Sequence, residues 1–190
     1  IRNVTVVENT VRGSDGSGIL LTATTDTGAA NFQAPIENVR IASNRVWRNA
    51  EHGIFLRAKP QQDLGGVTAS ISATEVVANN VQSNGGTGIA LRSLSTGSPG
   101  STGSRNVVLD HGTGLAIESV RTTVTRNAIG HNELGVSIED TNANVLNATE
   151  NNIYENDVGL ESSGTANATN NYWGHESGPE HDANPEGEGN

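Results

Sequence analysis

The chain of 190 residues contains neither cysteine nor methionine. Without cysteine it forms no disulfide bonds and offers no thiolate ligands to a metal ion. Without either sulfur-containing residue it also lacks the soft ligands on which copper-handling proteins depend. The fold must therefore be stabilised by packing and hydrogen bonding.

Basic residues are scarce as well, since 11 Lys and Arg stand against 21 Asp and Glu and the formal net charge is −10. Lys59 is the single lysine. This charge would repel the phosphates of a nucleic acid, so we expect no nucleic-acid partner. An acidic chain almost without lysine is typical of proteins adapted to high salt and indicates a halophilic origin, although many secreted proteins are acidic without such adaptation.

Long apolar segments are also missing. No apolar run approaches the roughly 20 residues that a transmembrane helix requires, so we predict no membrane span. Apolar residues do not recur at i, i+3, i+4 and i+7 for more than a few residues, which argues against helical repeats. The chain begins inside a repeat with no signal sequence, and we interpret it as a mature or excised part of a longer protein.

The sequence does contain a phased repeat built on asparagine. At seven places an Asn is followed two residues later by an apolar residue, or by Trp in the last unit: Asn9, Asn44, Asn79, Asn106, Asn127, Asn151 and Asn171. A second polar column follows five residues after the first six: Ser14, Asn49, Asn84, His111, Asn132 and Asn156. A glycine then opens each short apolar run: Gly18, Gly53, Gly88, Gly114, Gly135 and Gly159. A repeat with this fixed phase indicates a solenoid.

Each repeat has only short period-2 apolar pairs, such as Ile54 and Leu56, and cannot bury an apolar face alone. We therefore predict an all-β fold, a right-handed single-stranded parallel β-helix of about seven coils over residues 1–173. We expect the Asn columns to adopt left-handed αL geometry at the corners and to form amide ladders between coils. The glycines should let each next strand begin without a Cβ in the way. We interpret His111, in the second Asn column, as a corner residue before a functional one.

The first three repeats are longer than the others, and the extra residues follow the Gly-led strand. They predict insertions at 22–35, 57–66 and 92–105, which leave equivalent corners and should lie side by side. These insertions are either decoration of the scaffold or a ligand-binding wall. Their amide, cationic and aromatic side chains suit an acidic glycan, and the candidate ligand-binding residues are Phe32, Arg57, Lys59, Gln61, Arg92 and Arg105. Trp47, in the outward column of the repeat, either stacks on a sugar ring or packs under a loop.

The repeat N-x-[VI]-x-x-[NSH]-(x)2–3-G-[IVL]-x-[IL] resembles the units of secreted parallel β-helix proteins in the pectate-lyase-like superfamily. The segment 170–179, which reads NNYWGHESGP, resembles the N-N-x-W-G-x-x-S-G-P ending of the last coil in haloarchaeal members. The resemblance implies the fold and says little about function. Trp173 takes the inward position that Val or Ile fills elsewhere, so we expect it to close the end of the apolar stack. The acidic, Gly/Pro-rich segment 174–190 is then an end cap or a linker.

Named enzymes of this superfamily cleave or epimerise acidic polysaccharides, so a polysaccharide lyase, an epimerase or a glycoside hydrolase acting on uronate polymers is the alternative function. Such enzymes need carboxylates beside a base, or a pair of acids. The outward acids Glu139, Asp140 and Glu161 come from successive coils, but we expect no third acid and no Arg or Lys to join them in register. We therefore predict no catalytic residue and expect a non-catalytic extracellular or cell-surface scaffold that binds acidic glycans or assembles end to end into filaments.

Two further features remain open in the sequence. Asn3, Asn147 and Asn167 begin N-x-[ST] sequons and are possible N-glycosylation sites, although chance alone would produce as many. The tail has several acids and histidines between His175 and Asp182, which could bind Ca²⁺ weakly. A solvated tail is the simpler interpretation, and we predict no metal site and no cofactor.

Overall fold

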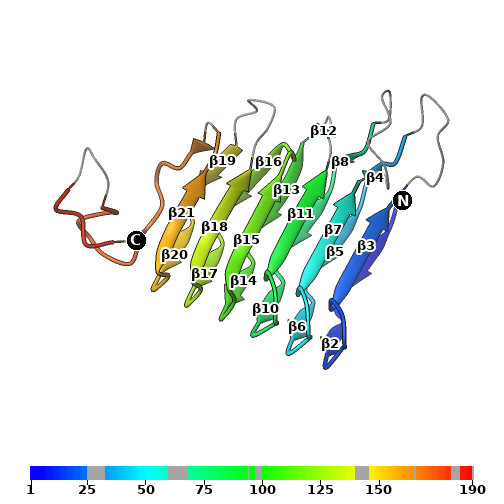
Figure 1. Cartoon of the computed structure of the whole chain (residues 1–190), viewed down its shortest axis with the longest axis horizontal. Coiled ribbons are helices and arrows are strands. Elements are labelled where there is room, and N and C mark those ends of the chain that lie inside the picture. Colours follow the sequence, from blue (N-terminus) through cyan, green and yellow to red (C-terminus); the bar gives the residue numbers. More distant parts are fainter. Residues whose placement is uncertain are drawn as a thin grey trace.

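The computed structural model is a stack of parallel β-strands wound into a solenoid (Figure 1). It describes residues 1–24, 33–59, 68–93, 95–96, 100–139, 146–164, 166–180 and 185–189. Within these ranges there is no helix, and so none that could cross a membrane. The coils follow one another along the long axis, from the N-terminal coil to a C-terminal tail at the other end. The predicted all-β parallel solenoid is confirmed.

Three parallel sheets extend along the stack, and a short fourth sheet accompanies the N-terminal coils. The first sheet contains β1 Thr5–Val7, β5 Arg40–Ala42, β9 Glu75–Val77, β13 Ser101–Ser104, β16 Thr122–Thr125, β19 Leu146–Thr149 and β22 Ala166–Asn167. The second contains β2 Thr10–Arg12, β6 Arg45–Trp47, β10 Asn80–Gln82, β14 Val107–Leu109, β17 Ala128–Gly130 and β20 Asn152–Tyr154. The third contains β3 Ile19–Ala23, β7 Ile54–Ala58, β11 Ile89–Ser93, β15 Thr113–Glu118, β18 Leu134–Glu139 and β21 Val158–Ser162. The fourth contains β4 Ile36–Glu37, β8 Ser70–Ser72 and β12 Ser95–Thr96.

The core consists of columns of identical or similar apolar side chains, one from each coil. In the second sheet Val46, Val81, Val108, Ile129 and Ile153 occupy the same inward position and are almost completely buried. Their neighbours on each three-residue strand point outward, because successive side chains alternate between the faces of a strand. Full burial of each such side chain contributes roughly 1.5–3 kcal/mol, so the columns are the main source of stability.

The first Asn column forms the predicted ladder. Asn44 donates its backbone N–H and its side-chain Nδ2 to Oδ1 of Asn79, at 3.0 and 2.9 Å. Its Nδ2 also donates to the carbonyl of Val6 in the preceding coil. The Asn side chains between the two ends of this column are buried, and each amide bonds backbone groups at its corner.

The prediction that these Asn residues adopt αL geometry was wrong. The residue before each of them has the positive φ, between 54° and 59°, and these residues are Glu8, Ser43, Ala78, Arg105, Arg126, Glu150 and Asn170. The ladder explains the difference, because the N–H and the side chain of the Asn must both point along the stack. The chain therefore reverses one residue earlier, at an outward position where Glu, Ser, Ala and Arg tolerate the left-handed conformation at a cost of about 1–2 kcal/mol.

The glycine column has the predicted role. A Cβ added to Gly53 would lie 2.3 Å from Cγ1 of Val81 and 2.6 Å from the carbonyl oxygen of Gly88. Since φ of this glycine is not in the left-handed region, close packing between coils is the constraint. Any larger residue would separate two neighbouring coils.

The predicted insertions differ from the observed boundaries. Strand β7 continues to Ala58 and β11 to Ser93, so Arg57 and Arg92 are strand residues. The range 92–105 includes β12 and the whole of β13, which is a regular member of the first sheet. Part of the extra length in the first three coils therefore forms the fourth sheet. Residues 25–32, 60–67, 94 and 97–99 lie outside the described residues.

The C-terminal tail packs on the last coil. Trp173 is partly buried and packs against the end of the core. The N–H of Gly189 donates to the carbonyl of Gly178 at 2.8 Å, which brings the end of the tail back toward the last coil. A Cβ on Gly189 would lie 2.5 Å from the carbonyl oxygen of Trp173. Figure 1 shows this segment beyond β20 and β21 along the axis.

Candidate functional site

An open groove lies on the outer face of the second sheet, over β6 and β10. Its lining residues are Arg45, Trp47, Arg48, Asn80, Gln82 and Ser83. The strand register brings them together, since Trp47 pairs with Gln82 on one side and with Arg12 on the other. Arg45 pairs with Asn80 in the same way. We call this surface the Trp47 groove.

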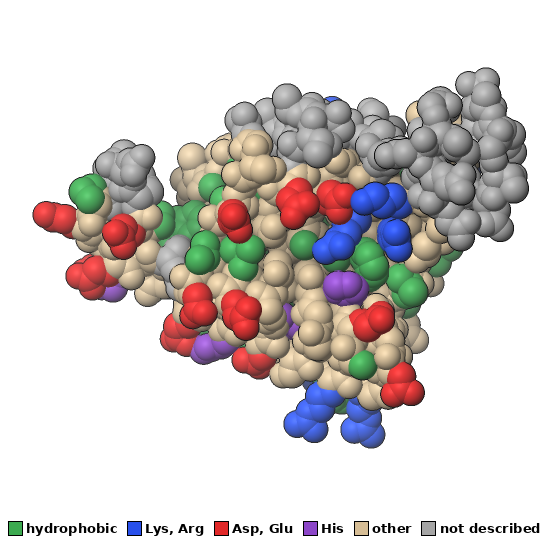
Figure 2. Space-filling view, in the orientation of Figure 1, with side chains coloured by type: hydrophobic (Ala, Val, Ile, Leu, Met, Phe, Trp, Pro, Cys, Tyr) green, Lys and Arg blue, Asp and Glu red, His purple; other side chains and the backbone are tan. Residues whose placement is uncertain are grey.

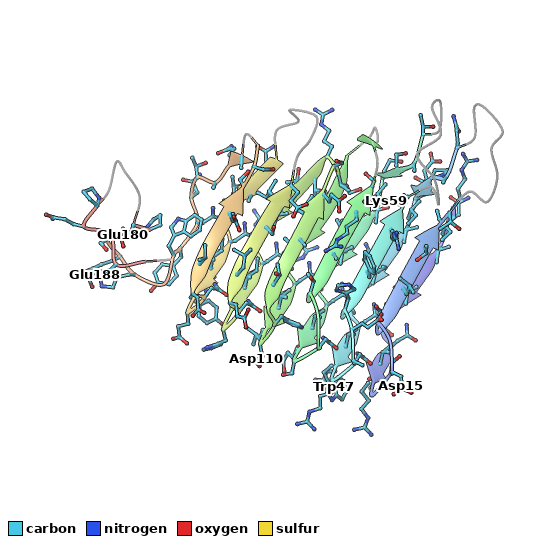
Figure 3. All side chains as sticks on the ribbon, viewed as in Figure 1. Asp15, Trp47, Lys59, Asp110, Glu180 and Glu188 are labelled. Atoms are coloured by element: carbon cyan, nitrogen blue, oxygen red, sulfur yellow. The ribbon has the colours of Figure 1, made fainter. Side chains whose placement is uncertain are left out.

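Trp47 presents a partly exposed indole in this groove. Its inward neighbour Val46 is fully buried, which fixes the strand and directs the indole outward. The guanidinium carbon of Arg12 lies 5.8 Å from the centre of the indole ring, a cation–π arrangement. Figure 3 shows Trp47 at the edge of the solenoid opposite Lys59. The indole thus has an apolar surface, with a positive charge beside it.

The charges around the Trp47 groove are not balanced. Within the described residues, no ion pair involves Arg12, Arg45 or Arg48. Guanidinium groups stay protonated in proteins and bind carboxylates with two parallel hydrogen bonds. Asn80 and Gln82 add amide donors and acceptors to the same surface. The groove therefore combines a stacking surface, cations and neutral polar groups.

A second cluster occupies the outer face of the third sheet and is centred on Glu118. Nζ of Lys59 lies 3.1 Å from Oε1 of Glu118, and Nε of Arg92 lies 3.8 Å from Oε2. Arg92 also lies over the ring of Phe55, with 5.6 Å between the guanidinium carbon and the ring centre. The ring of His52 packs edge-on against Phe55, and burial together with Arg92 lowers the pKa of His52. We call these residues the Glu118 cluster.

The outer row of the third sheet changes sign along the stack. Arg57 pairs with Arg92, which pairs with Glu118, which in turn pairs with Glu139. Figure 2 shows the resulting basic side chains beside a row of acidic ones on one face. The charges of Lys59 and Arg92 are partly neutralised by their ion pairs with Glu118. Arg57 has no ion pair within the described residues.

The structure brings together only part of the predicted ligand-binding set. Arg57, Lys59 and Arg92 lie on neighbouring coils of one face, as their similar positions in the repeat suggested. Trp47 lies on a different sheet and does not join them. Arg105 is at the corner between β13 and β14, with a φ of 55°. Phe32 and Gln61 lie outside the described residues.

Two groups of residues in these surfaces were not predicted. Arg45 and Arg48 flank the indole on their own strand and corner, and Glu118 joins the two cations of the third sheet. The sequence carried a signal for both groups. Arg45 stands one residue before the inward Val46. Glu118 stands four residues after the glycine that opens its apolar run, as Arg57 and Arg92 do in theirs.

His111 takes its predicted place in the second column. Its side chain is buried, and Nε2 lies 3.1 Å from Nδ2 of Asn84. Oδ1 of Asn84 already accepts hydrogen bonds from Asn49, so its Nδ2 must donate to the imidazole. Nδ1 of His111 has no hydrogen-bond partner within the described residues. Burial lowers the pKa of His111 to about 4, against the raising effects of Asn132 and Asp110.

The remaining predicted sites are on the surface or outside the description. Asn3 and Asn167 are exposed, and Asn147 is half-buried, with its Oδ1 accepting a hydrogen bond from Nδ2 of Asn167 at 3.2 Å. His175 and Glu176 lie in the tail, whereas 181–184 are outside the described residues. The described part of the chain contains no group of three or more His, Asp or Glu side chains placed to hold a metal ion.

Comparison of the chain with models of protein families, with curated proteins and with solved structures finds no match. The functional argument for this protein therefore depends on its own geometry.

Proposed function

We propose that this chain is a non-catalytic, extracellular β-helix scaffold that binds an acidic glycan in the Trp47 groove. One observation carries the proposal. In a chain with a net charge of −10, a partly exposed indole lies among three guanidinium groups without ion pairs in the described part of the chain. Cations left unpaired on an acidic protein attract anions to one place.

The groove offers a match for each part of a uronate. The apolar face of a sugar ring can stack on the indole of Trp47. Its carboxylate can form paired hydrogen bonds with the guanidinium of Arg45 or Arg48. The hydroxyl groups can exchange hydrogen bonds with Asn80 and Gln82, which donate and accept. Neutral glycans could stack on Trp47 and form the hydroxyl hydrogen bonds, but they lack the carboxylate that pairs with a guanidinium.

The repeat also supports this class of ligand. It resembles the units of secreted pectate-lyase-like β-helix proteins, whose named enzymes act on acidic polysaccharides, and this resemblance implies an extracellular location. A rigid row of strands is a suitable base for a chain-like ligand, because side chains on strands are held more precisely than side chains on loops. The scaffold and the groove therefore support the same proposal.

Tryptophan fluorescence tests the proposal directly, because the chain has two tryptophans. Trp173→Phe leaves Trp47 as the only reporter and keeps an aromatic ring at the end of the stack. Titration of this variant with oligogalacturonate or oligoguluronate should change the emission in a saturable way. Uncharged oligosaccharides of the same length should bind at least about ten-fold more weakly, because they lack the carboxylate.

Arg45→Ala in the same background should weaken uronate binding about ten-fold or more, since a charge-assisted pair contributes roughly 1.5–3 kcal/mol. Arg126→Ala is the matched control, because it also removes one positive charge but lies on a more distant coil, where it pairs with Glu150. Equal losses in the two variants would show a general charge effect and would overturn the assignment of the groove.

The Glu118 cluster favours a second candidate function, a lyase or hydrolase acting on uronate polymers. Lys59 and Arg92 converge on Glu118, and Glu139 is its neighbour in register. An acid pair beside a potential base is what such chemistry requires. Incubation with pectate or alginate, with and without Ca²⁺, should then release unsaturated or shortened sugars that Glu118→Gln abolishes. Sugars recovered at full length would reject this candidate.

A further inference from the structure

The outer face of the second sheet continues beyond the Trp47 groove. Its strands pair in parallel along the stack, and one outward position of each strand from β6 to β20 forms a single row. The residues of this outer row are Trp47, Gln82, Leu109, Gly130 and Tyr154. Figure 1 shows the five strands, β6, β10, β14, β17 and β20, one after another along the lower edge of the solenoid. The outer row therefore begins with an indole and ends with a phenol ring.

The phenol ring of Tyr154 is held over Gly130. A Cβ added to Gly130 would lie 2.7 Å from Cζ and 2.8 Å from Cε2 of Tyr154. Since φ of this glycine is not in the left-handed region, the contact with the ring is what excludes a side chain there. The ring also packs edge-on against His131, with 5.6 Å between the ring centres, and Nδ1 of His131 lies 3.0 Å from Oε2 of Glu155. Tyr154 is partly exposed, so it offers a second fixed stacking surface.

The strip between the two aromatic rings is built from uncharged residues. Beside the outer row, where the strands begin, stand Asn80, Val107 and Ala128, and together with Gln82 and Leu109 they are partly exposed. Because the phenol ring lies over the preceding coil, the aromatic rings are three to four coil steps apart, or roughly 14–19 Å at a strand spacing of about 4.8 Å. A sugar in an extended 1,4-linked chain advances by about one such step. A ligand that touches both aromatic rings must therefore have four or five sugars.

The unpaired cations that border this strip lie two coils apart on one side. Arg45 and Arg105 are both exposed on the side where the strands begin, on the coils of β6 and β14. No ion pair involves either of them within the described residues. On the next coil Arg126 is paired with Glu150. Asp110 stands on the opposite side of the strip, at the corner after β14.

This spacing matches the geometry of a ribbon-like polysaccharide. When the links between sugars are equatorial, the chain is flat and each sugar is turned over relative to the one before it. Every second carboxylate then lies on the same side. A chain that places one carboxylate at Arg45 thus places the next but one at Arg105 and directs neither toward Asp110. Axial links buckle the chain, and its sugar faces then cannot lie on both aromatic rings.

We propose that the Trp47 groove is one end of a longer binding surface, which holds a ribbon-like uronate chain with equatorial 1,4-links and four or five sugars between Trp47 and Tyr154. The first sugar stacks on Trp47 and the last on Tyr154. The inference rests on the proposed glycan binding, to which it adds the length and the linkage of the ligand. Tyr154 determines specificity on this surface, because only a chain of sufficient length and flatness reaches it.

Oligomannuronates and oligoguluronates test the inference, because the two sugars are epimers at C5 with the same composition and charge. The links of mannuronate chains are equatorial, and those of guluronate chains are axial. In calorimetric titrations we expect the five-sugar mannuronate to bind at least about ten-fold more tightly than the two-sugar mannuronate. The five-sugar guluronate should gain over its two-sugar form only what its larger number of possible positions allows.

Variants show whether Tyr154 causes the gain. Tyr154→Ala should remove most of it from the five-sugar mannuronate and leave the affinity for the two-sugar chain unchanged. Gly130→Val should act in the same direction, because the new side chain takes the place of the phenol ring and displaces it. Phe55→Ala is the matched control, since it also removes a partly buried ring from an outer face, but from the third sheet.

Circular dichroism shows in parallel that each variant is folded. The inference is overturned if the five-sugar mannuronate gains no more over its two-sugar form than the guluronate does, or if Tyr154→Ala keeps the gain. Failure of the proposed function gives a different result. In that case neither length of mannuronate binds, or Arg45→Ala binds the two-sugar chain as well as the natural chain does, and this inference fails with it.

Discussion

His111 places an imidazole in a column that otherwise contains amides and one terminal serine. An amide both accepts and donates, so it can continue a ladder through any number of coils. The neutral imidazole accepts the bond from Asn84 at Nε2, and this fixes its hydrogen on Nδ1, which has no partner in the described part of the chain. Protonation would turn Nε2 into a second donor facing the donor of Asn84.

This arrangement predicts a loss of stability in acid. The pKa of His111 is about 4 in the folded chain and about 6.5 when the chain is unfolded, so the unfolded state binds the proton first as the pH falls. The contribution of His111 to stability is complete above about pH 6.5, and it decreases toward pH 4 by about 3 kcal/mol.

His111→Asn should remove this dependence, because an amide restores both ladder bonds without a titrating group. Chemical denaturation at several pH values gives the free energy of unfolding of the natural chain and of the variant. The effects of the carboxylates cancel in the difference between the two values. The variant should gain relative stability between about pH 6.5 and 4. A difference that is constant with pH would contradict the burial of a neutral imidazole in the ladder.

At the scale of the element, the Asn ladder should be strongest inside the stack. Asn79 accepts two hydrogen bonds from Asn44 and donates to Asn106 and to the carbonyl of Ile41, all in buried surroundings. Asn79→Ala leaves several buried groups without partners and should lower the free energy of unfolding by about 3–5 kcal/mol.

The same change at the end of the column provides the comparison. Asn9 is exposed, so in Asn9→Ala water can replace the lost partners and the loss should be about 1 kcal/mol. Urea denaturation of both variants gives the two values. Equal losses would show that the ladder is a consequence of the fold with little part in stabilising it.

Much of the fold was predictable because successive coils repeat the same hydrogen bonds at the Asn column and the same close contacts at the Gly column. The ladder and the close approach at Gly53 followed from residue type and spacing alone. The αL position was misplaced by one residue, because the sequence does not show that the amide bonds determine the backbone of the Asn itself. The strand residues at 101–104 were assigned to a loop, since their Ser, Thr and Gly are typical of loops.

The candidate site was less predictable. Trp47 belongs to a three-residue strand that follows an Asn, whereas Arg57 and Arg92 belong to Gly-led strands, and the corner between these strands places them on different faces. A repeat pattern gives the register along the stack but not the angle at a corner. The contact between Glu118 and Arg92 could have been found by extending the column of Arg57 and Arg92 one coil further.

At the scale of the whole molecule, the stack has three long sheets, and candidate sites occupy the outer faces of two of them. The Trp47 groove and the Glu118 cluster lie on separate sheets, so each can be altered without disturbing the other. The central claim concerns the groove, because it combines a stacking indole with three guanidinium groups that have no ion pairs in the described part of the chain.

Calorimetric titration of the natural chain with a uronate oligosaccharide, followed by size analysis of the recovered sugar, tests that claim most directly. We expect saturable binding that leaves the sugar intact and that Trp47→Ala weakens at least about ten-fold, since a stacked aromatic contributes on the order of 1.5 kcal/mol or more. Glu118→Gln should bind as the natural chain does. Binding that Trp47→Ala leaves unchanged, or sugar recovered shortened or unsaturated, would contradict the account.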